Sequence, residues 1–245
     1  MTNQTKYGLI GLGVLVIIVA IFVATQTGLF SGGSGQGGVA SSTAPSLTEG
    51  VAFDQNIPAD LRDQLSQLIA DDREALSQNY DQYELWLRLA IRYKQAGDYQ
   101  KAREVWEYLA YNYPDDVVSR HNLGDLYQHF TVDYVKAEQY YLAALEADMI
   151  DGVGSAGVTY LALHELYRYD YKQNTSAAAD ILKQGIERIA GPQAIDLNAA
   201  LARYYESKGQ KAEAAAAYRA AAAGAREVNN TSLAAQFEAS AAALE

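Results

Sequence analysis

The sequence contains no cysteine. This absence excludes structural disulfides, thiol catalysis, zinc sites with cysteine ligands and lipidation of an N-terminal cysteine. Histidine is scarce, with three residues in 245, and no Walker motif, HExxH sequence or Ser-His-Asp order is present. We therefore expect no catalytic site, no metal site and no cofactor, and predict that the chain is not an enzyme.

Basic residues are also few, with 19 Lys and Arg against 30 Asp and Glu. Only Lys6 precedes the first acidic residue, Glu49, so the chain from Glu49 onward holds 18 basic and 30 acidic residues. A surface this acidic repels phosphate backbones, and nucleic acid is not an expected partner. Apolar residues make up 49% of the chain, which is enough to form a core.

Residues 7–24, YGLIGLGVLVIIVAIFVA, form an uncharged apolar run. As a helix they would extend about 27 Å, close to the ~30 Å hydrocarbon core of a bilayer. We interpret residues 1–30 as a cytoplasmic tip and one transmembrane anchor. A cleaved signal peptide is the alternative, but its apolar core is normally only ~7–15 residues long. Lys6 precedes the run and the next basic residue is Arg62, which places the following domain outside the cytoplasm, on the periplasmic or cell-surface side.

Residues 31–56 begin with a Gly/Ser-rich stretch, SGGSGQGG, and we expect a flexible linker there. The domain that follows, residues 57–245, contains a recurring pattern. Leucine and tyrosine four residues apart lie on one face of a helix, and small residues let two helices approach closely. The tyrosine of this pattern recurs at positions 93, 127, 167 and 205. Its first copy comprises Trp86, Leu89, Ala90, Tyr93, Ala102, Trp106 and Pro114.

This pattern resembles the tetratricopeptide repeat (TPR). The resemblance implies an all-α fold, a right-handed superhelical solenoid of four helix hairpins, at residues 83–116, 117–150, 157–192 and 195–228. Helical apolar stripes predict capping helices at 57–79 and 231–245. Extra residues fall in the turns of the second and third hairpins, HFTVDY and YKQNTS.

Three other features have a structural and a chemical interpretation. Gly152 to Gly157 fits GxGxxG, but a dinucleotide site needs a strand before it, so we expect a loop between repeats. The acid pairs Asp71-Asp72 and Asp115-Asp116 are expected at helix ends or turns. We expect packed or hydrogen-bonded side chains rather than metal ligands for the histidines, His121, His129 and His164.

The 19 tyrosines are more than the repeat pattern requires. Packing between repeats and an interface with a partner both remain open for those outside it. These are Tyr80, Tyr83, Tyr108, Tyr111, Tyr113, Tyr169 and Tyr171.

In the TPR family, ligands usually lie in a concave groove lined by the first helix of each hairpin. The resemblance assigns this partner-binding groove to Glu84, Leu87, Ile91, Lys94, His121, Asp125, Gln128, Leu161, Glu165, Arg168 and Arg203. Leu87 and Ile91 make its first part apolar, which suits a protein segment with apolar anchors. We predict a membrane-anchored scaffold that binds a protein or peptide in the cell envelope. The alternative is a structural protein that self-associates as a homo-oligomer.

Overall fold

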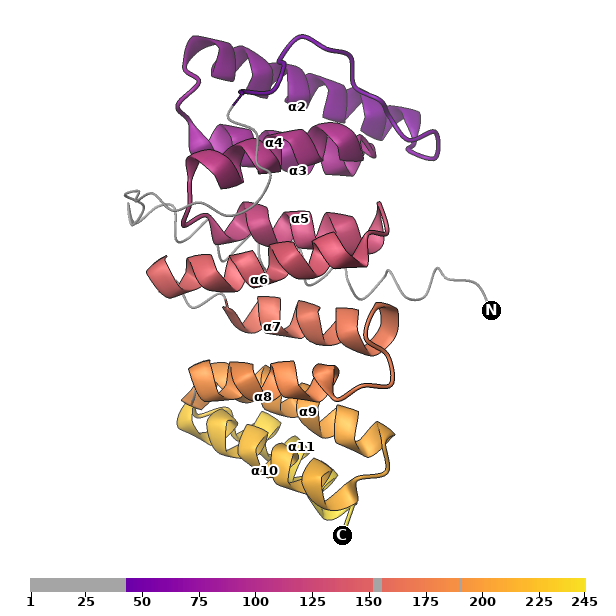
Figure 1. Ribbon diagram of the computed structural model, residues 1–245, viewed down its shortest axis with the longest axis vertical. Helices are drawn as coiled ribbons and strands as arrows, with labels where there is room; N and C mark the ends of the chain where they lie inside the picture. The colour runs from indigo at the N-terminus through magenta and orange to yellow at the C-terminus, as the bar shows by residue number, and fades with distance from the viewer. Residues whose placement is uncertain (1–42, 152–155, 190) are drawn as a thin grey trace. The chain divides into compact units, whose positions relative to one another are not determined.

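The computed structural model describes residues 43–151, 156–189 and 191–245, which form ten α-helices and no β-strand (Figure 1). The all-α expectation is confirmed for these residues. A π-helical turn, η1 (Leu166–Asp170), follows α7, and a 3-10 turn, η2 (Gly191–Ala194), precedes α9. The helices are α2 (Ala59–Gln78), α3 (Tyr83–Ala96), α4 (Tyr99–Asn112), α5 (Val117–His129), α6 (Tyr134–Asp151), α7 (Ala156–Glu165), α8 (Ala177–Ile189), α9 (Ile195–Ser207), α10 (Lys211–Glu227) and α11 (Thr231–Ala242).

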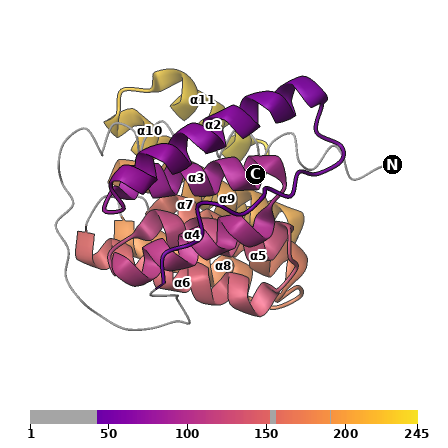
Figure 2. The same ribbon diagram turned by 90° about the horizontal axis from the view of Figure 1, so that it is seen from above.

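Helices that follow one another in the chain also pack against one another, from α2 to α11. The eight central helices form four pairs, and within each pair a turn joins two helices that pack together as a hairpin. The pairs are α3 with α4, α5 with α6, α7 with α8, and α9 with α10. Seen from above, α6 and α8 lie on the side of the stack away from α2 (Figure 2). This sequential packing is consistent with an α-solenoid.

Small residues allow the helices to approach closely. Ala90 on α3 and Ala102 on α4 have no exposed surface. At Gly124 on α5, an added Cβ atom would lie 2.5 Å from the ring of Tyr141 on α6. The Tyr141 ring is buried, and its hydroxyl donates to Gln128 Oε1 at 3.0 Å. Packing therefore requires glycine at position 124.

The extra residues of the second and third hairpins are accommodated differently. In the α5–α6 turn, Val132 is exposed and adopts a φ of 54°, which is unusual for a β-branched residue. In the third hairpin, α7 continues into η1, where the Tyr171 N–H donates to the Leu166 carbonyl oxygen at 2.8 Å. A π-helical turn is wider than an α-helical one. The extra residue of the second hairpin therefore lengthens a turn, whereas the extra residues of the third hairpin change the end of a helix.

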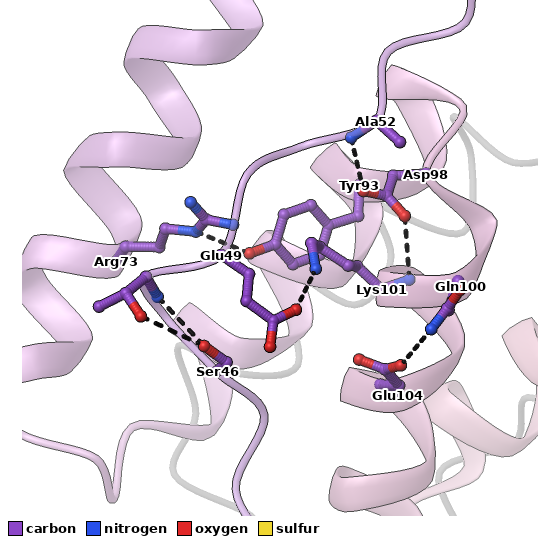
Figure 3. Close-up of polar contacts among 10 residues, drawn as sticks. Ser46, Glu49, Ala52, Arg73, Tyr93, Asp98, Gln100, Lys101 and Glu104 are labelled. Carbon is purple, nitrogen blue, oxygen red and sulfur yellow. Dashed lines mark hydrogen bonds and ion pairs between the residues drawn. The ribbon is translucent and has the colours of Figure 1, made fainter.

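The segment before α2 is attached to the α3–α4 turn (Figure 3). The Ala52 N–H donates to Asp98 Oδ2 at 2.9 Å, and Lys101 Nζ lies 2.8 Å from Glu49 Oε2. Asp98 Oδ1 also accepts from the Lys101 N–H and so caps the N-terminus of α4. One carboxylate thus joins the incoming segment to a helix terminus.

A second contact depends on a glycine in the same turn. The Asp54 N–H donates to the Ala96 carbonyl oxygen at 2.8 Å. Gly97 has a φ of 80°, and a Cβ atom there would lie 2.7 Å from Asp54 Cβ. Residues 49–54, expected to belong to the flexible linker, are therefore held against the folded domain.

The expected transmembrane span, residues 7–24, lies outside the described residues, as does the whole Gly/Ser-rich stretch, residues 31–38. Among the residues that the structure describes, no helix combines the length and the apolar character that a bilayer crossing requires.

Candidate functional site

The residues predicted to line the groove come from the first helix of each hairpin: α3, α5, α7 with its extension η1, and α9. We call this set the first-helix face. It divides into two parts. Lys94 on α3 and the polar groups His121, Asp125 and Gln128 on α5 are bound within the protein, whereas the cations of η1 and α9 have no oxygen partner among the described residues.

Asp125 on α5 is buried and forms an ion pair with Lys94 on α3. His129 Nε2 lies 3.8 Å from the other oxygen of Asp125. Lys94 Nζ also lies 4.9 Å from the centroid of the Phe130 ring, a distance at which a cation is attracted to an aromatic face. The charges of Lys94 and Asp125 therefore neutralise each other and connect the first two hairpins.

Gln128, on the same helix, is buried with both ends of its amide bound. Its Oε1 accepts from the Tyr141 hydroxyl, and its Nε2 donates to Asp170 Oδ2 at 2.8 Å. Asp170 is the last residue of η1. The amide thus links the second hairpin to the third, and its burial keeps it from a ligand on the surface.

His121 is also engaged inside the chain. Its Nδ1 lies 3.1 Å from Thr159 Oγ1 on α7, and its ring contacts the Tyr141 ring at 5.3 Å between centroids. The pKa of His121 is lowered to about 4, chiefly by burial; Asp125 acts to raise it and Lys94 to lower it. His121 is therefore neutral at pH 7.

The apolar anchor expected on α3 is only partly available. The Leu87 side chain is 7% exposed and belongs to the core, whereas Ile91 is half-buried. Glu84 at the start of α3 is exposed, and Leu161 on α7 is half-buried. Leu87 therefore offers little apolar surface to a partner, and its place in the groove remains a prediction.

The other end of the first-helix face has a different character. Arg168, in η1, lies over the Tyr169 ring at 5.0 Å and over the Tyr204 ring at 5.6 Å. Lys208, just after α9, lies 5.5 Å from the same Tyr204 ring. Arg203 on α9 is exposed. Tyr204, which the sequence analysis did not select, is therefore the centre of a cluster of cations.

Arg168 and Arg203 lie near a common neighbour, His164 on α7. Burial lowers the pKa of His164, the hydrogen bond that the ring donates to the Ala178 carbonyl oxygen raises it, and both arginines lower it. His164 Nδ1 lies 2.7 Å from the Ala178 carbonyl oxygen. Glu165, another predicted groove residue, is exposed on the same helix.

The cations of this cluster have no oxygen partner among the described residues. Arg168, Arg203, Lys208 and the nearby exposed Lys211 share this property. Every other Lys and Arg in the described parts of the chain donates to an oxygen or lies within 4.0 Å of a carboxylate. In a chain with an excess of acidic residues, free guanidinium groups on one face are suited to bind a carboxylate.

The remaining candidates have structural roles. Asp116 caps α5, as expected, by accepting from the Ser119 N–H at 3.0 Å. Asp72 does not lie at a helix end: it is in the interior of α2, 1% exposed, and forms ion pairs with Arg88 and Arg92. The end-of-helix prediction for Asp72 is therefore wrong, because α3 supplies two arginines that hold a buried carboxylate.

Two chemical interpretations of the sequence are a dinucleotide site at the GxGxxG stretch and a metal site at the histidines. Most of the GxGxxG stretch, residues 152–155, lies outside the described residues. In the part of the chain that the structure describes, no group of three or more His, Asp or Glu side chains is placed to hold a metal ion.

Comparison with known proteins finds no family model that matches the chain, and no curated protein matches it significantly. The first-helix face is therefore interpreted from its geometry and chemistry.

Proposed function

We propose that this protein is a TPR-type scaffold that binds a segment of a partner protein on its first-helix face. Several packing features support the TPR assignment. Trp86, Leu89, Tyr93 and Trp106, all members of the recurring pattern, are buried. Glycine and alanine stand where successive helices approach most closely, as at Gly124. Helices paired in this way are expected to form the right-handed superhelix of the family.

The single observation that carries the binding function is the cluster of cations without oxygen partners: Arg168 and Lys208 lie over the Tyr204 ring, and Arg203, like Arg168, lies near His164. Stacking on tyrosine rings holds the Arg168 guanidinium in place while leaving its N–H groups free. A carboxylate of a partner segment would accept two parallel hydrogen bonds from such a group. The proposed ligand is therefore a protein segment that presents carboxylates at this end of the face, and no cofactor is required.

Site-specific photo-crosslinking in native membranes tests this function. A photoreactive residue replacing Leu161, on the first-helix face, should form adducts with another protein, whereas one replacing the exposed Glu187 on α8 should not. Arg168→Gln together with Arg203→Gln should reduce the adducts at position 161 severalfold. Identical adducts from both positions, or none at either, would rule the assignment out.

The anchor and the location belong to the same proposal. The uncharged run at residues 7–24 would hold the scaffold in a membrane, with the N-terminus in the cytoplasm and the helical domain outside. Protease added to sealed inverted vesicles should then leave the helical domain intact, whereas protease added to spheroplasts should digest it. The reverse pattern would contradict the proposed orientation.

A specific observation favours the alternative, self-association. Val135, Leu142 and Met149 lie seven residues apart on α6, and all three are exposed, Met149 by 73%. A seven-residue apolar spacing is typical of helices that pair with a second helix. In the crosslinking experiment, adducts formed only between copies of this chain would favour this function over the scaffold.

A further inference from the structure

A second surface lies where α3 begins and α4 ends, and three aromatic contacts build it. The ring centroids of Tyr80 and Trp86 are 6.1 Å apart, and those of Trp86 and Tyr108 are 5.2 Å apart. Tyr83 and Tyr113 meet edge-on at 5.0 Å. The Trp86 indole is buried and donates to the Tyr80 carbonyl oxygen at 2.8 Å, so it forms the base of the surface.

The side chains above the buried Trp86 indole are accessible to solvent, and they include both aromatic rings and carboxylates. Tyr80 is 47% exposed and Tyr111 is 51% exposed, while Asp81 and Glu84 are also exposed. Burial raises the pKa of Tyr113, and the neighbouring carboxylates Asp81 and Glu84 raise it further. We name this surface the aromatic–acidic patch and define it as Tyr80, Asp81, Glu84, Tyr108, Tyr111 and Tyr113.

The patch has no cation of its own. Elsewhere in the described residues, Lys and Arg side chains lie over aromatic rings, for example Lys172 over Tyr167 and Arg73 over Tyr93. No such contact involves a ring of the patch, and neither Asp81 nor Glu84 has an ion-pair partner among the described residues. The Arg120 guanidinium, which donates to the Tyr113 carbonyl oxygen, is buried and also donates to two other backbone carbonyl oxygens.

The distribution of charge along the chain adds a long-range electrostatic preference for cationic partners at this surface. Residues 49–151 hold 20 acidic and 9 basic residues, whereas residues 152–245 hold 10 acidic and 9 basic residues. The patch therefore lies in the half of the sequence that carries almost all of the net negative charge. That field attracts cationic segments and repels anionic lipid surfaces.

We infer that the aromatic–acidic patch is a docking surface for a basic segment of a partner protein. Arginine or lysine side chains of that segment would lie on the tyrosine faces and pair with Asp81 and Glu84. This surface is distinct from the carboxylate-binding end of the first-helix face. Glu84 is the one residue that belongs both to the patch and to the first-helix face as a whole. The inference does not depend on the function proposed above.

Fluorescence anisotropy with the full-length protein and a labelled peptide of six Arg-Gly repeats tests the inference. The arginine peptide should bind, and a matched Glu-Gly peptide should not. Asp81→Asn with Glu84→Gln should weaken binding about five- to twenty-fold, since an exposed ion pair contributes up to ~1 kcal/mol. Asp81→Asn alone, which leaves the first-helix face unaltered, should account for about half of the loss in logarithmic terms.

The matched control is Asp60→Asn with Asp63→Asn. It removes the same charge from exposed positions at the far end of α2, roughly 25 Å along the helix from the patch. This control should change affinity less than two-fold. Equal losses in both double variants would show that the peptide responds only to net charge and would overturn the inference.

A second readout reports from within the patch. Trp86 and Trp106 are the only tryptophans, and the Trp106 indole makes no hydrogen bond in the described structure, so Trp106→Phe removes none. In that background, the arginine peptide should alter Trp86 emission, and Tyr108→Leu should weaken binding about three-fold. No binding of the arginine peptide, or binding without any change in Trp86 emission, would refute the docking surface.

Discussion

Replacing Gly124 by alanine is expected to destabilise the protein, although alanine is the better helix former. The substitution adds one carbon atom between α5 and α6, where the new Cβ would meet the Tyr141 ring at 2.5 Å. The ring cannot retreat easily. It is buried, it contacts His121, and its hydroxyl is bound to Gln128.

The magnitude follows from two opposing effects. Alanine in place of glycine stabilises a helix interior by about 1 kcal/mol. Overpacking a rigid site costs about 1–3 kcal/mol, and the fixed Tyr141 ring places this site in the upper part of that range. We therefore expect the free energy of unfolding to fall by about 1–2 kcal/mol. With a urea dependence of ~2 kcal/mol per molar, the unfolding midpoint should fall by about 0.5–1 M.

Urea unfolding followed by far-UV circular dichroism measures this change. Gly157→Ala on α7 is the control, because its Cβ would meet its nearest neighbour at an ordinary 3.6 Å. That variant should be unchanged or slightly stabilised. If Gly124→Ala were as stable as the unaltered protein, close approach of α5 and α6 would not be the reason for glycine at this position.

Two further predictions concern buried polar groups. Asp72→Asn should lower the free energy of unfolding by about 2–3 kcal/mol, because the substitution leaves Arg88 and Arg92 without their carboxylate. The control is Asp71→Asn, at the exposed neighbouring position, which should change the free energy of unfolding by less than about 0.5 kcal/mol in the same urea titration. The pKa of His121 is about 4 in the folded chain, against an ordinary value of 6.5. As the pH falls from 6.5 toward 4, the unfolded chain therefore binds a proton at His121 before the folded chain does, and the free energy of unfolding decreases over that range. His121→Gln should reduce that slope relative to the unaltered protein, and equal slopes would contradict the assignment of a neutral histidine with a lowered pKa.

The positions of the helices could be predicted from the sequence because they depend on local spacing. Leucine and tyrosine four residues apart define a helix face, and each small residue marks a close approach. The same reasoning places α2 and α11 at the two ends. The docking of residues 49–54 could not be predicted this way, because it depends on a φ of 80° at Gly97 and on a distant carboxylate, Asp98.

The candidate site was predictable only as a set of helix faces. The resemblance to the TPR family placed Lys94, Asp125, Gln128, Arg168 and Arg203 on a common first-helix face, but it did not distinguish bound groups from free ones. Lys94 and Asp125 are 31 residues apart, and Gln128 and Asp170 are 42 residues apart. Such pairs form only when hairpins stack.

Local periodicity in the sequence therefore determined which segments become helices and which face of each is apolar, since both depend on neighbours within one or two turns. The stacking of those helices decided which charges are neutralised, because an ion pair forms only where the chain brings two distant side chains within about 4 Å. Arg168 remains available because the tertiary structure brings two tyrosine rings to its guanidinium group, and among the described residues no carboxylate lies within 4.0 Å of Arg168 or of the exposed Arg203.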